Sequence, residues 1–147
     1  MKEFFKEIFE YNYQINQKIL AVMAKNASSC SEKSISLMNH ILNAHQIWNN
    51  RILSKPDAVK VWEIRMLSEL KGIDQNNYQT SMELIESCQL DEEIHYKKST
   101  GEVYKNNVRD LLFHISNHST YHRGQIATEF RNSGLEPIIS DFIIFKR

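Results

Sequence analysis

Apolar residues recur every three or four positions through several long stretches of the chain, and this spacing predicts amphipathic helices. The first predicted helix covers residues 2–25, and the second covers residues 32–53 and ends at SKPD, whose proline cannot continue a helix. The last long helix follows a cap at Asn107 and runs to about residue 132, where NSG and Pro137 form a stop signal. Two alternative caps precede the second helix: Ser29 with Glu32, and Ser31 with Ser34.

The stretch between the second helix and the last one is less regular. Residues 57–72 could hold a short helix that stops at Gly72, and Asp74 is then the expected cap of a third long helix, which ends near Cys88. Alternating residues on both sides of STGE predict a small β-hairpin with Gly101 in its turn. The closing segment PIISDFIIFKR is too apolar to stay in water, so we expect it to pack onto the helices.

The scarcity of turn-forming residues supports long helices over a sheet protein. Only 4 glycines and 2 prolines interrupt the 147 residues. We therefore predict an all-α protein with one domain over residues 1–147: an antiparallel four-helix bundle, a small β-hairpin before the last long helix, and a short C-terminal tail. Such bundles place metal and cofactor sites between facing helices.

Charge and cysteine content restrict the function classes. Lysine plus arginine and aspartate plus glutamate balance at 18 each, so no basic excess favours nucleic acid as a partner. Charges interrupt the apolar positions of MKEFFKEIFEYNY, and no apolar run approaches the roughly 18 residues that a membrane helix needs. The 2 cysteines form no CxxC pair and no disulfide framework. We expect a cytoplasmic protein that acts on a small molecule, without nucleic-acid or membrane partners.

Histidines are the main candidate for chemistry, and three of them recur every four residues in HISNHSTYHRGQI. On a helical wheel, His122 lies about 40° from the apolar centre, His118 about 40° further round, and His114 beyond the edge of the stripe. In the second helix His45 falls among apolar residues, whereas His40 falls about 140° away, on the predicted solvent side. The wheel thus directs His45, His118 and His122 into the bundle.

Three inward histidines from two helices could hold a divalent ion. Three neutral imidazoles leave at least one coordination position open for water, substrate or a thiol, which is typical of a catalytic site. The ion would make a bound water or thiol more nucleophilic near neutral pH. Imidazole suits zinc, nickel, copper and iron alike. The alternative is that these histidines are only hydrogen-bonded core residues.

Polar residues beside the histidines are candidates for a supporting role. His114, Asn117, Arg123 and Gln125 could orient the imidazoles or contact an anionic substrate. Ordinary surface positions are the competing interpretation for Asn117 and Arg123, and Gln125 lies on the His118 side of the wheel. Gly124 lies opposite the apolar centre, where another helix or a second subunit could approach closely.

The string NHSTYHRGQI, preceded by DLLFHIS and accompanied by HILNAHQIW in the second helix, resembles the DinB family of DinB/YfiT-like metalloenzymes. The resemblance extends over the whole chain in the same order of elements. It implies a four-helix bundle that is often a homodimer, with one divalent metal ion, zinc or nickel, on His45, His118 and His122. It also implies a low-molecular-weight thiol as a possible cosubstrate, because the family includes thiol-dependent S-transferases.

Three functions are compatible with these residues. The first is a metal-dependent transferase or hydrolase, in which the three-histidine site activates a thiol or water for attack on a small electrophile. The second is a non-catalytic metal-binding or stress-response protein. The third is a bundle whose histidines are structural. No residue pattern indicates a Ser-His-Asp triad or a phosphate-binding glycine loop, and the catalytic residues stay unassigned.

Overall fold

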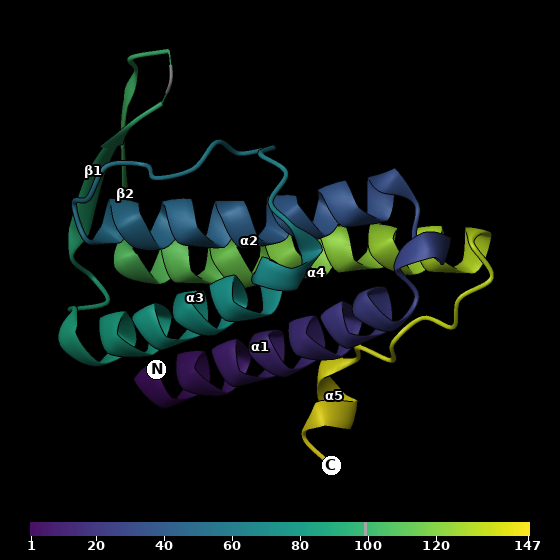
Figure 1. Ribbon diagram of the computed structural model, residues 1–147. Helices are drawn as coiled ribbons and strands as arrows, with labels where there is room; N and C mark the ends of the chain where they lie inside the picture. Colours follow the sequence, from purple (N-terminus) through teal and green to yellow (C-terminus); the bar gives the residue numbers. More distant parts are fainter. Residues whose placement is uncertain (99) are drawn as a thin grey trace.

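A computed structural model describes residues 1–98 and 100–147, and Figure 1 shows its long helices lying side by side. The predicted bundle with its hairpin and C-terminal tail is confirmed. The elements in chain order are α1 (Lys2–Lys25), the short 3-10 helix η1 (Ala27–Ser29), α2 (Glu32–Ile52), α3 (Leu67–Ser87), β1 (Glu93–Lys97), β2 (Val103–Asn107), α4 (Val108–Asn132) and α5 (Phe142–Phe145).

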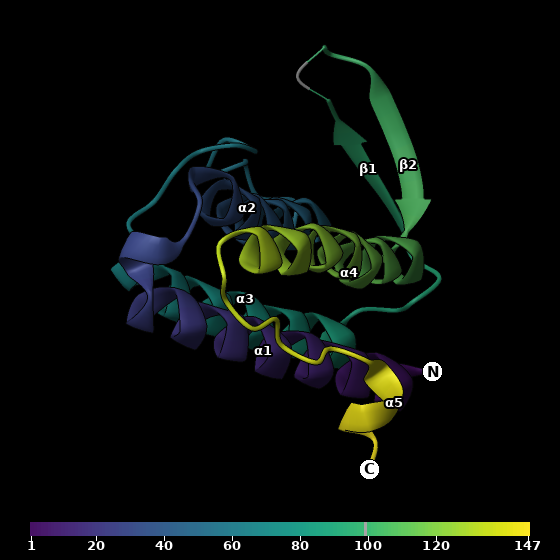
Figure 2. The same cartoon turned by 90° about the vertical axis from the view of Figure 1, so that its right-hand side faces the viewer.

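The helices pack as two antiparallel pairs, α1 with α3 and α2 with α4 (Figures 1 and 2). Contacts of α2 with α3 and of α1 with α4 complete the bundle. Figure 1 shows that α2 and α3 run in the same direction, because residues 53–66 cross back along α2 before α3 begins. We call this crossing segment, residues 53–66, the α2–α3 loop. It decides which side of α2 meets solvent.

The apolar faces of the long helices form a core of two clusters, which supplies the main driving force for folding. One cluster joins α1, α2, α3 and the C-terminal half of α4 beneath the tail. The other joins the N-terminal part of α1, the last turns of α2 and α3, and the start of α4, next to the hairpin. Among the described helices, none is both long and apolar enough to cross a membrane.

Local capping explains where α2 and α4 begin and end. Ser31 caps α2, since its hydroxyl accepts a hydrogen bond from the Ser34 amide at 3.1 Å, which confirms one of the two expected caps. The helix ends at Ile52, one residue before the expected end. Asn107 precedes α4 as expected, but its side chain makes no capping hydrogen bond. Gly134 follows α4 with φ +73°, the left-handed conformation that ends a helix.

The predicted start of the third helix was wrong, because α3 begins at Leu67 and contains both Gly72 and Asp74. A local cap makes this earlier start possible: the Glu69 carboxylate accepts a hydrogen bond from the Met66 amide at 3.1 Å. Asp74 does not cap a helix. It is buried against α1, where its carboxylate accepts hydrogen bonds from Asn16 and Gln17.

The hairpin and the tail follow the predictions. β1 and β2 pair antiparallel from Glu93 opposite Asn107 to Lys97 opposite Val103. Gly101 adopts φ +87° near the turn, while Ser99 of the predicted STGE turn lies outside the described residues.

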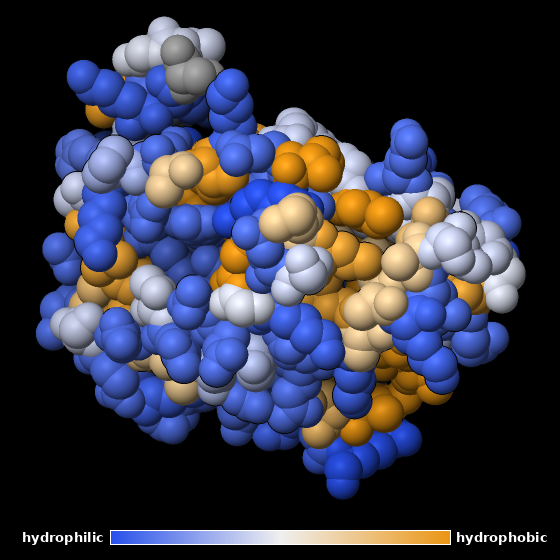
Figure 3. Space-filling view, viewed as in Figure 1, coloured by the Kyte–Doolittle hydropathy of each residue, from blue (hydrophilic) through white to orange (hydrophobic). Residues whose placement is uncertain are grey.

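The tail packs onto α1, where the ring of Tyr11 meets that of Phe142 edge to face at 5.2 Å. Figure 3 shows hydrophobic residues gathered at the lower right, where the C-terminal segment runs in Figure 1. Exposed apolar side chains of the tail include Ile139, Ile143 and Ile144. The tail therefore covers part of the bundle and keeps an apolar outer side.

A buried polar network crosses the bundle between α1, α3 and α4. The Arg123 guanidinium of α4 donates hydrogen bonds to the side-chain oxygens of Asn12 and, at 3.2 Å, Asn16. Asn16 in turn donates to the Asp74 carboxylate of α3 at 2.9 Å. Burial raises the pKa of Asp74 from 3.8 to about 6, and its two amide donors and the positive charge of Arg123 oppose that rise.

The raised pKa of Asp74 predicts a pH-dependent stability. Between pH 3.8 and about 6 the folded state holds a proton that the unfolded state has lost, so stability falls as pH rises through this window. We expect Asp74→Asn to abolish this loss of stability, which amounts to roughly 2–3 kcal/mol between pH 4 and 8 in the unchanged protein. Urea denaturation between pH 4 and 8, with chelator present, measures the difference.

The exposed Asp91 offers a matched control, because Asp91→Asn also removes one carboxylate but leaves the core intact. Its slope should follow that of the unchanged protein. Parallel curves for Asp74→Asn and the unchanged protein would show that the Asp74 carboxylate does not cause the pH dependence.

Candidate metal centre

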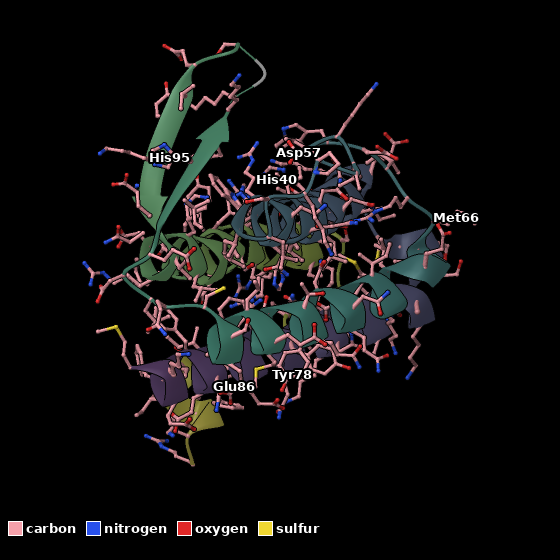
Figure 4. The ribbon with its side chains drawn as sticks, turned by 90° about the vertical axis from the view of Figure 1, so that its left-hand side faces the viewer. His40, Asp57, Met66, Tyr78, Glu86 and His95 are labelled. Carbon is pink, nitrogen blue, oxygen red and sulfur yellow. The ribbon has the colours of Figure 1, made fainter. Side chains whose placement is uncertain are left out.

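Three histidines meet between α2 and α4: His40 from α2, and His118 and His122 from α4. The Nε2 atom of His118 lies 2.9 Å from Nε2 of His40 and 3.1 Å from Nε2 of His122. The four-residue spacing puts His118 and His122 on one face of α4, and the antiparallel packing of α2 brings His40 opposite them. Figure 4 shows His40 at the edge of α2 nearest the α2–α3 loop. The ligand atoms of the three side chains all lie within 4.8 Å of one another, so this group could hold a metal ion.

Hydrogen bonds at the outer nitrogens fix two of the imidazoles. Nδ1 of His40 lies 3.2 Å from the carbonyl oxygen of Val61, and Nδ1 of His122 lies 2.7 Å from Oε1 of Gln125. Both oxygens accept, so both Nδ1 atoms must carry the proton. In a neutral imidazole the Nε2 atom then keeps its lone pair, and both lone pairs are available at the centre of the group.

This tautomer assignment makes the donor set fit a cation. The proton on Nε2 of His118 could bond to His40 or to His122, but not to both, so one short nitrogen–nitrogen contact would bring two lone pairs together. A cation between the nitrogens removes this repulsion and accepts all three lone pairs. Acceptors on the outer nitrogens are the usual support of metal-binding histidines. The residues present therefore fit a divalent ion.

The surroundings favour the neutral, metal-binding form of His118 and His40. Burial, and after it the neighbouring imidazoles of His122, His40 and His114, together lower the pKa of His118 to about 3. Burial also lowers the pKa of His40. Protons therefore compete weakly with a metal ion at neutral pH.

The α2–α3 loop covers His40 and supplies its hydrogen-bond acceptor. The indole of Trp62 stacks on the imidazole of His40 with ring centroids 3.8 Å apart and planes 5° from parallel. The Asn43 amide donates to the carbonyl oxygen of Glu63 at 2.8 Å, and the Arg65 guanidinium donates to the side-chain oxygen of Asn43 at 2.6 Å. The loop is thus bound to α2 directly after Val61 and Trp62, the residues that contact His40.

The sequence-based prediction that His40 faces solvent was wrong. A bare helical wheel leaves its side of α2 uncovered, but the α2–α3 loop folds over that side and leaves only 7% of His40 exposed. The loop residue Val61, whose carbonyl oxygen accepts from His40, was missed as well. A signal was present in the polar residues of that face, Asn39, Asn43 and Gln46, which bind Arg65 of the loop.

The structure does not bring His45 into the group of three. His45 is 3% exposed and points toward α3, where its Nε2–H donates to the Ser81 hydroxyl at 2.7 Å. Ser81 cannot donate back because its proton is given to Asn49 at 3.0 Å. Burial lowers the pKa of His45 to about 3, so it is a neutral core histidine. The histidines that meet in space are therefore His40, His118 and His122, while the ligand set of His45, His118 and His122 expected from the sequence stays a prediction.

The four candidate supporting residues have different positions. Gln125 contacts His122 as described, and the ring of His114 packs on that of His118 with centroids 5.6 Å apart. Asn117 is exposed and lines a groove on the α1 side of α4, away from the histidines. Arg123 is not a surface residue: it is 3% exposed and belongs to the buried network with α1. Two of the four therefore touch the histidine group.

No other helix in the described part of this chain makes the close approach considered for Gly124, and the approach of a second subunit stays a prediction. Within the described residues, no atom lies within 4 Å of the position that a Cβ would take there. Glu129, a further acidic residue of α4, binds Ser31 at 2.8 Å and Lys33 at 3.5 Å at the start of α2. It supports the helix packing and does not join the histidines.

Comparison with known proteins agrees with the resemblance seen in the sequence. The family model described as DinB family matches residues 1–147. The "Uncharacterized protein YizA" of Bacillus subtilis (strain 168) is 27% identical over 93% of this chain and 92% of its own length. The "Protein DinB" of the same organism is 23% identical over 99% of this chain and 95% of its own length.

The geometry predicts that His40, and not His45, contributes to metal binding. We expect His40→Ala to weaken zinc or nickel binding at least about 100-fold, because it removes one of three nitrogen donors. His45→Gln keeps a donor for Ser81 and should leave metal affinity within about threefold while lowering stability. Competition titrations with a chromogenic chelator measure both affinities. The reverse order of effects would restore His45 as the ligand and reject the group described here.

Gln125 provides a second prediction, because its only described role at the site is to accept the Nδ1 proton of His122. Gln125→Leu should weaken metal binding about 10-fold or more, since the imidazole loses its fixed tautomer and orientation. Gln89→Leu, at an exposed position after α3, is the matched control and should bind metal normally. Equal affinities in the two variants would remove Gln125 from the site.

Proposed function

This chain belongs to the DinB family, and on that premise we propose that it is a metal-dependent enzyme that transfers a thiol to a small electrophilic substrate. The observation that carries the proposal is that the Nε2 atoms of His40, His118 and His122 meet at one point. In His40 and His122 the proton of the neutral ring lies on Nδ1, where it is hydrogen-bonded, so Nε2 keeps its lone pair. Such a set binds a divalent ion, zinc or nickel, through neutral donors and leaves part of its coordination sphere free.

Neutral ligands favour activation of a bound nucleophile. A divalent ion held in this group would act as a Lewis acid and lower the pKa of a thiol or a water beside it. Three imidazoles add no negative charge, so the chain itself does not reduce the ion's ability to do so. The stacked Trp62 and the buried face of α2 exclude water from one side of His40.

The composition of the group favours a thiol over water as the nucleophile. Among the described residues, no aspartate or glutamate joins the three histidines, so the group itself supplies no carboxylate to take a proton from water. A thiol needs less help, because its ordinary pKa is about 8.5 whereas that of water is about 15.7. Hydrolysis is therefore the second candidate, and it would need a base that comes with the substrate.

Each residue of the group has a defined task in this proposal. His40 and His122 present fixed lone pairs, held by the Val61 carbonyl and the Gln125 amide. His118 lies between them and stays neutral because of burial. Gln125 and the loop thus set the direction of the donors before any ion binds, which reduces the cost of assembling the site.

We expect the zinc- or nickel-loaded protein to accelerate the reaction of a low-molecular-weight thiol with a chromogenic aryl halide. His118→Ala should lower kcat/KM by at least about 100-fold, and chelation should lower it similarly, with activity restored by adding metal back. His95→Ala is the matched control, because His95 is an exposed histidine of the hairpin whose ring contacts Glu93. The rate is measured as the consumption of the free thiol over time.

The outcomes separate the candidate functions. Metal-dependent cleavage of an activated ester without thiol, combined with no thiol transfer, would reject the transferase in favour of a hydrolase. Tight metal binding with no acceleration for any thiol or ester would reject both enzymes and favour a metal-binding protein. Equal rates in His118→Ala and the unchanged protein would reject this site as the catalytic centre.

A further inference from the structure

A second feature lies beside the histidine group: a cleft of about 400 Å³ between the end of α2, the hairpin and the start of α4. Its lining combines aromatic, cationic and amide side chains: Trp48, Arg51, Tyr96, Lys98, Asn106 and His114, together with Asp110 and Leu111. Figures 1 and 2 show that the hairpin projects from the bundle at this end, so strand residues form one wall. The three metal-binding histidines do not line this cleft.

Arg51 is held in the cleft by aromatic rings. Its guanidinium carbon lies 4.6 Å from the centre of the Trp48 ring and 5.3 Å from that of Tyr96. Tyr96 is itself fixed, because its hydroxyl donates to the side-chain oxygen of Asn106 at 2.8 Å. A guanidinium held over aromatic rings keeps N–H donors available for an anion, and a carboxylate matches two of them with its two oxygens.

The acidic groups nearby leave this positive charge only partly compensated. Asp57 binds one Nη of Arg51 at 3.2 Å, which uses one side of the guanidinium. Asp110 lines the cleft, and its carboxylate lies 3.8 Å from the guanidinium of Arg109, a residue that does not line the cleft. Lys98 adds a further positive charge, with its ammonium 4.4 Å from the Tyr104 ring. The cleft therefore offers two cationic groups to a bound molecule.

Aromatic contacts connect the cleft to the histidine group. The ring of His114, in the cleft wall, lies 5.1 Å from that of Trp48 and 5.6 Å from that of His118. His114 and His118 are one turn apart on α4, or about 6 Å along the helix axis. A molecule of a few carbon atoms that occupies the cleft could thus extend toward the histidine group.

We propose that this cleft binds the carboxylate of the reacting small molecule, with Arg51 as the bidentate donor and Trp48 and Leu111 against its apolar part. Only the statement that the bound molecule reacts rests on the proposed function, because binding of its carboxylate to Arg51 needs no metal. Arg51 and Lys98 would then determine specificity, favouring acidic thiols or electrophiles over neutral ones of the same length.

Binding of hexanoate to the full-length, metal-free protein tests the cleft directly, with hexanol and hexyl phosphate as comparison ligands. We expect hexanoate to bind at least 10-fold more tightly than hexanol and to shift the indole N–H signal of Trp48 in an NMR titration. The protein has 2 tryptophans, and Trp62→Phe assigns the two signals. Arg51→Gln should lower hexanoate affinity at least 10-fold, and Lys98→Gln should lower it by a smaller factor.

Arg131→Gln, at an exposed arginine near the end of α4, is the matched control and should bind hexanoate as the unchanged protein does. Unchanged hexanoate affinity in both Arg51→Gln and Lys98→Gln, or no preference over hexanol, would overturn the proposal. Tighter binding of hexyl phosphate would overturn the carboxylate assignment in favour of a phosphate site.

A second titration separates this proposal from the proposed function. With zinc or nickel bound, 6-mercaptohexanoate should bind more tightly than hexanoate, because the thiol reaches the ion while the carboxylate stays on Arg51. Equal affinities, with the Arg51→Gln effect retained, would keep the carboxylate cleft and count against thiol activation at the metal.

Discussion

The hydrogen bonds that bind the α2–α3 loop to α2 are the constraint on which the histidine group depends. Arg65 of the loop donates to Asn43 and Gln46, and its own backbone amide donates to Asn39 at 2.8 Å. These bonds place the Val61 carbonyl where it accepts the Nδ1 proton of His40. Without the loop, His40 would be a surface side chain with free rotation and no fixed tautomer. Long connections without helix or strand are uncommon in small domains, and this one has a structural role: it covers and orients His40.

The helix α4 carries two polar systems on different sides, and they have opposite physical characters. Toward α1, the two Nη atoms of Arg123 donate to side-chain oxygens of Asn12, Asn16 and Thr120, and the bonds to Asn12 and Asn16 join α4 to α1. Toward α2, the Nε2 atoms of His118 and His122 meet that of His40, and the three nitrogens have too few N–H protons for each contact to be a hydrogen bond. Hydrogen bonds between side chains of different helices stabilise the bundle, whereas nitrogen lone pairs without a donor offer a place for a ligand. This contrast explains why neighbouring residues, His122 and Arg123, have unrelated roles.

The hairpin extends the histidine side of the molecule. It covers the end of the bundle where α2 stops, and Tyr96 of β1 reaches the rings of Trp48 and the guanidinium of Arg51. The α2–α3 loop and the hairpin thus lie beside the contact between α2 and α4 at different points along its length. The bundle positions the histidines, and these two additions shape what can approach them.

The sequence by itself determined the number and extent of most helices, because each long helix carries an apolar stripe and its own end signals. It also identified His118 and His122, since both lie four residues apart on one helix and their relation is local. The boundaries of α3 were less accessible, because Asp74 has the residue type of a cap but is buried by a tertiary contact with Asn16.

Tertiary structure alone decided which histidine of α2 completes the group. On a wheel, His45 is apolar-facing and His40 is not, and within the isolated helix that description is correct. The wheel does not show that the α2–α3 loop returns over the outer face of α2. It also does not show which helix the inner face of α2 meets. Here the inner face of His45 meets Ser81 of α3, and the loop turns the outer face of His40 into an interior one. Periodicity measures direction from the helix axis, whereas a metal site requires atoms from distant segments to meet at one point.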